Sequence, residues 1–190
     1  MTSLTIRTDL SQYPRDPLVK LYLSAFQHTP MAKILGPQRA YQLLDSTLCQ
    51  DYAMGAFYGD QLIGLAGFQT PEGSFTGAAS PQMLKQQLGT ITYCRLAWLS
   101  RTEHRAFNQG ELLHNGLVVA KEWRNQGVGR RLLTEFTQLC KAHQCHCLRL
   151  EVERNNLSAC ALYHSIGYIE EACHPKRDQQ VVTMRRYLPN

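Results

Sequence analysis

Positive charge and glycine gather between residues 124 and 131, in the string Arg-Asn-Gln-Gly-Val-Gly-Arg-Arg. The apolar run Leu117 to Val119 precedes them and helical periodicity follows, so the glycines open a helix after a buried strand. The first backbone N–H groups of a helix lack partners within it and lie at the positive end of its dipole. Gly127 and Gly129 carry no Cβ, which lets an anion approach the main chain. The stretch therefore predicts a phosphate-binding junction, with formal charge from Arg124, Arg130 and Arg131.

The spacing excludes two common phosphate-binding motifs. A P-loop needs a glycine, four residues and then Gly-Lys-Ser/Thr, and the chain has no such string. A dinucleotide fingerprint needs a third glycine where this chain has Leu132.

Further along, Asn156 and Tyr163 are two helical turns apart and so share one face, with the small Cys160 between them. A tyrosine pKa near about 10 keeps the hydroxyl protonated at neutral pH. Such a hydroxyl can protonate a thiolate whose conjugate acid has a pKa of about 8.5. The small Cys160 side chain leaves room for a ligand arm to lie across this helix face.

Both stretches resemble motifs of the GNAT superfamily of N-acetyltransferases. Residues 124–129 match Q/R-x-x-G-x-G/A, and residues 150–168 match L-x-V followed by N-x-x-A-x-x-L-Y-x-x-x-G-F/Y. The resemblance covers residues 50–188 well and the first 50 loosely. It implies an α/β (α+β) GNAT fold: a mixed, mostly antiparallel central sheet of six or seven strands, flanked by helices and splayed at the central strands to hold coenzyme A.

The resemblance also implies roles for residues. In the family the loop amides hold the pyrophosphate of acetyl-coenzyme A, the central strand pairs with the pantetheine arm, and a strand N–H, here that of Val118 or Val119, stabilises the oxyanion. No metal is implied. The implied cofactor-binding residues are Leu117, Val118, Val119, Arg124, Asn125, Gln126, Gly127, Val128, Gly129, Arg130 and Asn156.

The predicted catalytic residues are Tyr163, Glu151 and Glu111. Tyr163 matches the family's general acid. Glu151 matches the base proposed in ribosomal-protein alanine acetyltransferases, whose strand also reads L-E-V, and Glu111 and His114 are alternative bases. Arg149 shares the strand face of Glu151, so an ion pair competes with catalysis for that carboxylate.

The elements that must position these residues follow from periodicity and turn signals. Gly59-Asp60 suits a tight hairpin, and Gly167 suits a left-handed helix end. Asp16 is expected to cap a helix whose first residue is Pro17. Further helices are expected after Gly36-Pro37, over 81–107, from 128, and over 156–167. Strands are expected at 4–7, 53–58, 61–68, 117–119, 147–152, 168–173 and 181–187.

A chain of 190 residues is long enough for one core, so we expect a single acetyltransferase domain over 1–190. A helical insertion at about 75–108 either covers the acceptor site, or packs on the sheet edge or forms a dimer contact. The insertion and the closing hairpin are candidate surfaces for a homodimer.

Composition limits the partners. The net charge of +5 comes without a basic stripe or nucleic-acid module, and no segment looks like a membrane span or signal peptide. We therefore expect a cytoplasmic protein. Seven cysteines without a C-x-x-C pair indicate reduced thiols. The expected reaction is acetyl transfer from acetyl-coenzyme A to a primary amine, on a small molecule or a peptide. The alternatives are a coenzyme A-binding sensor or interaction module without turnover, and transfer of larger acyl groups.

Overall fold

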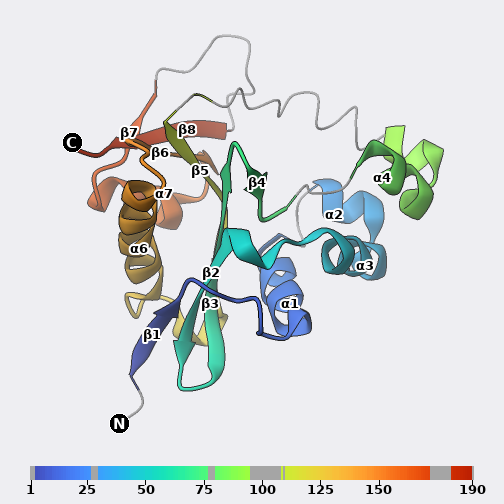
Figure 1. The fold of residues 1–190 in the computed structure, drawn as a ribbon, viewed down its shortest axis with the longest axis horizontal. Coiled ribbons are helices and arrows are strands. Elements are labelled where there is room, and N and C mark those ends of the chain that lie inside the picture. The colour runs from blue at the N-terminus through green and yellow to red at the C-terminus, as the bar shows by residue number, and fades with distance from the viewer. Residues whose placement is uncertain are drawn as a thin grey trace.

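The computed structural model describes residues 3–26, 30–76, 80–94, 108, 110–171 and 181–189. An eight-stranded sheet runs through the molecule in the order β1-β2-β3-β5-β6-β8-β7, with β4 beside β3 (Figure 1). Strands β5 and β6 are parallel, and the other pairs among the described residues are antiparallel. The predicted mixed, mostly antiparallel sheet is confirmed, with eight strands where six or seven were expected. The strands are β1 Leu4–Arg7, β2 Ala53–Tyr58, β3 Gln61–Thr70, β4 Gly73–Ser74, β5 Glu111–Val119, β6 Cys147–Glu153, β7 Ile169–Glu170 and β8 Val181–Tyr187.

Helices flank both faces of this sheet. They are α1 Arg15–Phe26, α2 Pro30–Leu35, α3 Pro37–Thr47, α4 Pro81–Leu88, α6 Val128–Ala142 and α7 Leu157–Ser165, with short 3-10 turns η1 Gln50–Tyr52 and η3 Lys121–Trp123. The prediction that Asp16 caps the first helix is wrong, because α1 begins one residue earlier. Asp16 lies in the first turn, where its carboxylate is 2.8 Å from Lys20 Nζ.

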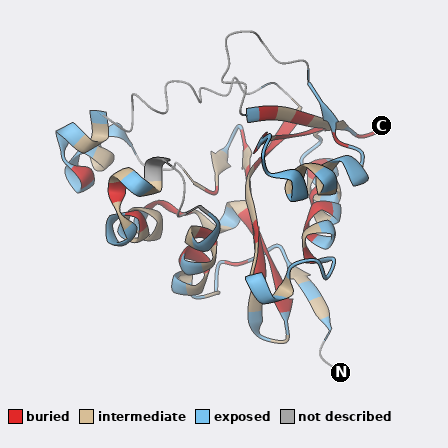
Figure 2. Ribbon diagram, turned by 180° about the vertical axis from the view of Figure 1, so that it is seen from behind, coloured by how far each residue is buried: buried red, intermediate tan, exposed pale blue. Residues whose placement is uncertain are grey.

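Two apolar cores lie on opposite faces of the sheet. On one face α6 packs on the sheet through Leu132, Leu133 and Phe136. On the other, α1 packs through Leu18 and Val19. Figure 2 shows the buried residues concentrated in the central strands and on the inner sides of these helices. Burial on both faces explains why the middle strands are so rich in apolar residues.

Strand β5 contains a bulge that changes which residues face each core. Ala66 pairs with Leu117 and Phe68 with His114, so β5 has one more residue than β3 between these pairs. Gly116 supplies the positive φ of 92° at the bulge. A Cβ on Gly67 of β3 would lie 2.7 Å from the Asn115 carbonyl oxygen, so the bulge needs glycine opposite it.

The described part of the predicted insertion includes helix α4, capped by Ser80, whose hydroxyl accepts from Met83 N at 3.1 Å. The expected continuous helix is broken at Gly89, which has a φ of 77°. Residues 90–94 are again helical, and 95–107 lie outside the described residues. Leu88 packs with residues of α2 and α3, away from α6 and α7 (Figure 1). This part of the insertion therefore extends the helical layer and does not cover the sheet edge.

Among the helices that the structure describes, none combines the length and apolarity needed to cross a bilayer.

Candidate active site

The two parallel strands separate partway along their length. The β5–β6 ladder contains the pairs Glu111–Cys147, Leu112–Leu148 and Leu113–Arg149. Beyond Leu113, β5 continues against β3 while β6 continues against β8. The bulge in β5 lies directly after this point, and a bulged strand bends. The result is a wedge between β5 and β6, which we call the β5–β6 wedge.

Helix α6 follows β5 and the η3 turn, and the residue before it has a left-handed backbone. Its N-cap residue Gly127 has φ 81° and ψ −3°, and a Cβ there would meet no atom within 4 Å. The first bond within the helix runs from Arg131 N to Gly127 O at 2.9 Å. The amides of the three residues between them consequently have no acceptor within the helix. Space and unsatisfied donors coincide here, as an anion site requires.

The second glycine has a different role from the first. A Cβ on Gly129 would lie 3.2 Å from Leu162 of α7, and 3.8 and 3.9 Å from Leu117 and Val119 of β5. Gly129 thus allows the start of α6, helix α7 and the open edge of β5 to meet closely.

Polar side chains hold the loop before α6. Arg124 Nε donates to Val119 O at 3.2 Å, which keeps the guanidinium beside the end of β5. Gln126 Nε2 donates to Glu122 O at 2.8 Å, and Arg130 Nη2 donates to Ser165 Oγ at 2.8 Å. Asn125 has a φ of 60°, so it contributes a left-handed turn. The structure therefore brings the predicted loop residues together at one end of the wedge.

The register of β5 distinguishes the amides of its last residues. Ala120 N donates to Ile63 O at 2.9 Å, and Val119 lies opposite Gly64. Because hydrogen-bonded and non-bonded pairs alternate in an antiparallel ladder, Val118 bonds to β3 whereas Leu117 and Val119 point their N–H groups away from it. Between the two oxyanion donors predicted from sequence, this geometry favours Val119 over Val118.

Asn156 and Tyr163 lie on α7, as their spacing predicts. The Asn156 side-chain oxygen caps the helix by accepting from Ala159 N at 3.2 Å, and its amide nitrogen can donate to a ligand. Tyr163 is half-buried, and burial raises the pKa of its hydroxyl to about 12. The hydroxyl therefore keeps its proton through the physiological pH range.

The two predicted carboxylates gather with two arginines on the sheet face opposite α6. Arg149 places Nη1 3.5 Å from Glu111 and Nη2 3.6 Å from Glu151. Arg185 brings Nε to 3.0 Å from Glu111 without hydrogen-bond alignment, and also contacts Glu171. The ion pair predicted between Arg149 and Glu151 is confirmed. Pairing of this kind makes buried charge tolerable.

His114, the third candidate base, lies on the other face. It is only 6% exposed, its ring centroid is 4.0 Å from that of Phe136, and its Nε2 is 2.6 Å from Tyr168 Oη. Burial lowers the pKa of His114 to about 3. The imidazole is thus neutral and enclosed in the α6 core, separated by the sheet from the two carboxylates.

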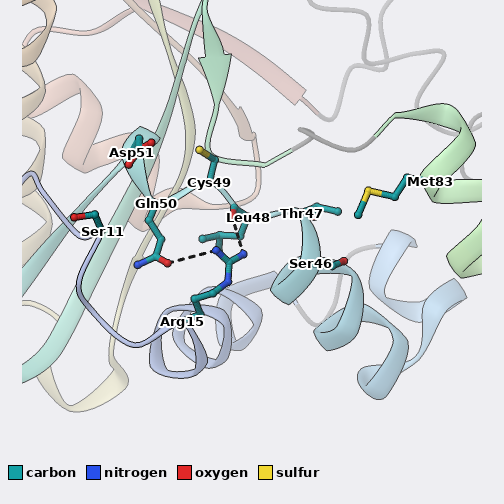
Figure 3. Close-up of a pocket in the computed structure, with 9 residues that line it drawn as sticks. All are labelled: Ser11, Arg15, Ser46, Thr47, Leu48, Cys49, Gln50, Asp51 and Met83. Atoms are coloured by element: carbon teal, nitrogen blue, oxygen red, sulfur yellow. Dashed lines mark hydrogen bonds between the residues drawn. The ribbon is translucent and has the colours of Figure 1, made fainter.

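A polar pocket of about 400 Å³ lies elsewhere, between α1, the end of α3 and α4. Figure 3 shows the Arg15 side chain in its centre, with bonds to Gln50 and Leu48. Arg15 Nη2 also donates to Asp45 O at 2.5 Å, so this guanidinium closes the C-terminal end of α3. The lining contains none of the residues predicted to act: it consists of Ser11, Arg15, Ser46, Thr47, Leu48, Cys49, Gln50, Asp51 and Met83.

Sequence reasoning missed Arg185, Asn115 and the His114–Tyr168 pair. Charged residues alternating with apolar ones in β6 and β8 were a usable signal, because buried charges need partners. The Asn115 side chain bonds Ser74 Oγ at 2.6 Å and Thr76 Oγ1 at 2.8 Å. No local pattern reveals these contacts, since they join segments far apart in the chain.

Comparison with solved structures finds the same fold in proteins of low sequence identity. The PaiA N-acetyltransferase from Thermoplasma acidophilum, in complex with coenzyme A, has 15% identity and a TM-score of 0.60, covering 97% of this chain and 99% of that one. Ard1 from Thermoplasma volcanium has 17% identity and a TM-score of 0.61, covering 98% and 99%. A ribosomal-protein-alanine N-acetyltransferase from Brucella melitensis has 18% identity and a TM-score of 0.57, covering 97% and 99%.

A search of curated protein sequences found no match. The sequence model of the Acetyltransferase (GNAT) family matches residues 15–168, which include the β5–β6 wedge, the α6 N-terminus and α7. The chain therefore belongs to the GNAT acetyltransferase family.

Proposed function

We propose that the protein is an N-acetyltransferase that moves the acetyl group of acetyl-coenzyme A directly to a primary amine in a ternary complex. The observation that carries the proposal is the meeting of three features around Gly129: the α6 N-terminus, the open edge of β5 and the helix that bears Tyr163. The coenzyme A complex of the PaiA N-acetyltransferase, which shares the fold, supports the choice of cosubstrate.

The residues present suit a diphosphate with a thioester arm. The amides of Val128, Gly129 and Arg130 would hold the diphosphate, with charge from Arg124 and Arg130. The N–H groups of Leu117 and Val119 would pair with the arm as a neighbouring strand would. These assignments use donors that the helix and the β3 ladder leave without acceptors.

Bound acetyl-coenzyme A supplies the acetyl group as a thioester, so transfer forms a C–N bond and breaks a C–S bond. The Val119 N–H would stabilise the developing oxyanion, a contribution of about 2.7–4 kcal/mol in other acyl-transfer enzymes. The Tyr163 hydroxyl would donate its proton to the departing sulfur. At neutral pH this hydroxyl carries its proton, as a general acid must before it can donate.

The amine must lose a proton on the way, and Glu151 is the better placed of the two carboxylates. Glu111 lies within the closed part of the β5–β6 ladder and contacts both Arg149 and Arg185. Glu151 lies two residues beyond the last pair of that ladder, where the wedge opens. Glu151 would therefore accept the proton from the face opposite Tyr163, and Glu111 would mainly hold the arginines.

The test is thiol release from acetyl-coenzyme A with a panel of small monoamines, diamines and peptides that offer a free N-terminus or a lysine. We expect release with at least one class. Tyr163→Phe should slow it about 10²- to 10⁴-fold, the usual contribution of a positioned acid. Tyr187→Phe, which changes an exposed tyrosine on β8, is the matched control and should retain activity. Calorimetric binding of coenzyme A without thiol release from any amine would instead indicate a binding module.

A further inference from the structure

A buried histidine lies at the point where the wedge begins. His114 is the first residue of β5 after the last pair with β6, Leu113–Arg149. Its side chain lies on the α6 face, against Phe136. At His114 the backbone of β5 no longer pairs with β6, and the bulge has not yet begun. Contacts of this side chain can therefore fix the position of β5 where the wedge opens.

The His114 side chain makes a hydrogen bond, on the α6 face of the sheet, to a residue just after the end of α7. Its Nε2 lies 2.6 Å from Oη of Tyr168, which is only 1% exposed. Tyr168 follows Gly167, whose φ of 92° turns the chain away from the helix. A neutral imidazole has one acceptor nitrogen, and the short distance fits the Tyr168 hydroxyl donating to Nε2. Within the part of the chain that the structure describes, Nδ1 has no hydrogen-bond partner.

Tyr168 in turn contacts Tyr163. The ring centroids are 5.7 Å apart, and Tyr168 N donates to Tyr163 O at 3.1 Å. The hydrogen bond thus connects His114 of β5 to Tyr168, and Tyr168 contacts both the ring and the backbone of Tyr163. Buried polar contacts of this kind specify one arrangement of a core, because breaking them leaves a group without a partner.

We propose that His114 and Tyr168 are positioning residues: their buried hydrogen bond fixes α7 relative to β5 and so sets where the Tyr163 hydroxyl lies beside the wedge. The role in turnover rests on the proposed function. Neither residue touches the reacting atoms, and both act through Tyr163. A general acid displaced by about 1 Å can lose a large part of its effect, so the bond matters for rate more than for binding.

Tyr168→Phe tests this directly, because it keeps the ring and removes the hydroxyl. We expect kcat to fall about tenfold while KM for acetyl-coenzyme A stays within about twofold. In the Tyr163→Phe background the same change should have no further effect on kcat. An equal fall in both backgrounds, or no fall in either, would overturn the proposal.

Substitutions of His114 give a second test. His114→Gln keeps a polar group near the position of Nε2 and should retain most of kcat, whereas His114→Leu leaves the Tyr168 hydroxyl unpaired and should not. Tyr41→Phe removes a 2.7 Å bond to Asp16 on distant helices and serves as the control. Activity that is equal in the Gln and Leu variants would contradict a positioning hydrogen bond.

A spectroscopic measurement separates this proposal from the proposed function. In protein labelled with ¹³C at tyrosine Cζ, the Tyr163 signal should shift on Tyr168→Phe and stay in place on Tyr41→Phe. A shift in a protein that releases no thiol would leave the positioning role standing and reject the transferase. An unmoved Tyr163 signal would reject the positioning role whether or not the protein turns over.

Discussion

Gly127 provides the sharpest test of the phosphate site. The substitution Gly127→Ala adds a Cβ to a residue with φ 81°, where no atom lies within 4 Å of the new carbon. Steric overlap with neighbours is thus absent, and the cost comes only from the left-handed backbone, about 1–2 kcal/mol. The chain can relieve this cost by rotating toward negative φ. That rotation would turn the amides of residues 128–130 away from a bound diphosphate.

The expected loss of affinity follows from those amides. A hydrogen bond to a charged group contributes about 1.5–3 kcal/mol, which corresponds to a rise of about 10- to 150-fold in the Kd for coenzyme A when one is lost. Titration calorimetry measures Kd, and urea unfolding measures the free energy of unfolding. Gly127→Asn, with a side chain that tolerates left-handed backbone, should lose less stability.

Gly36→Ala is the matched control. Gly36 has a φ of 72°, also has no atom within 4 Å of a Cβ, and caps the distant helix α3. The φ and ψ (164°) of Gly36 belong to a region almost confined to glycine. The Gly36→Ala variant should therefore lose at least as much stability as Gly127→Ala. Its Kd should equal that of the wild type. Unchanged coenzyme A affinity in Gly127→Ala, or an equal loss in Gly36→Ala, would refute the assignment of the α6 N-terminus.

Three further predictions concern protons. Because the pKa of Tyr163 is raised to about 12, an alkaline fall in kcat/KM centred below about pH 11 should persist in Tyr163→Phe; its disappearance would show that Tyr163 titrates there. Glu151→Gln should remove the acidic limb of the pH–rate profile while Glu153→Gln, on the same strand, keeps it; identical profiles would exclude Glu151 as base. The pKa of His114 is depressed to about 3, so its neutral form stabilises the fold above pH 6.5, and this stability is lost as pH falls toward 3. Between pH 6.5 and 5, the free energy of unfolding of the wild type should fall by up to about 2 kcal/mol more than that of His114→Leu. Urea unfolding at each pH measures both values. Equal losses would mean that His114 protonates freely in the folded protein.

Much of the secondary structure was predictable because it depends on local signals. The Gly59-Asp60 hairpin, the strand from Cys147, the helix from Val128 and the left-handed Gly167 all lie where turn residues and periodicity place them. Helix α2 was missed because its six residues are too few to show a period. The strand expected at Leu117–Val119 already begins at Glu111. Its first half was not predicted because the bulge interrupts the alternation of apolar and polar residues along the strand.

The candidate site was less predictable, since it depends on register. Sequence placed Glu151 and Arg149 on one strand face, and their 3.6 Å contact follows from that alternation. The approach of Arg185 to Glu111 needs the order of strands in the sheet, which no residue pattern supplies. Likewise His114 was a plausible base in sequence because it lies just before the predicted central strand. It is three residues from Glu111, however, so the alternation of a strand points the two side chains to opposite faces.

The bulge in β5 connects these observations. Before the bulge, Leu112 packs in the α6 core, and Glu111 points to the other face, where it pairs with Arg149. Beyond it, Val118 packs in the α1 core while Leu117 packs against the α6 core. Without the extra residue every later side chain of β5 would change faces. One inserted residue thus bends the strand away from β6 and keeps both cores filled. Tyr163 packs on the α6 face, and the carboxylates of Glu111 and Glu151 lie on the other face, so the sheet itself separates them. A transfer that needs a proton donor and a proton acceptor on opposite sides of one thioester requires that separation.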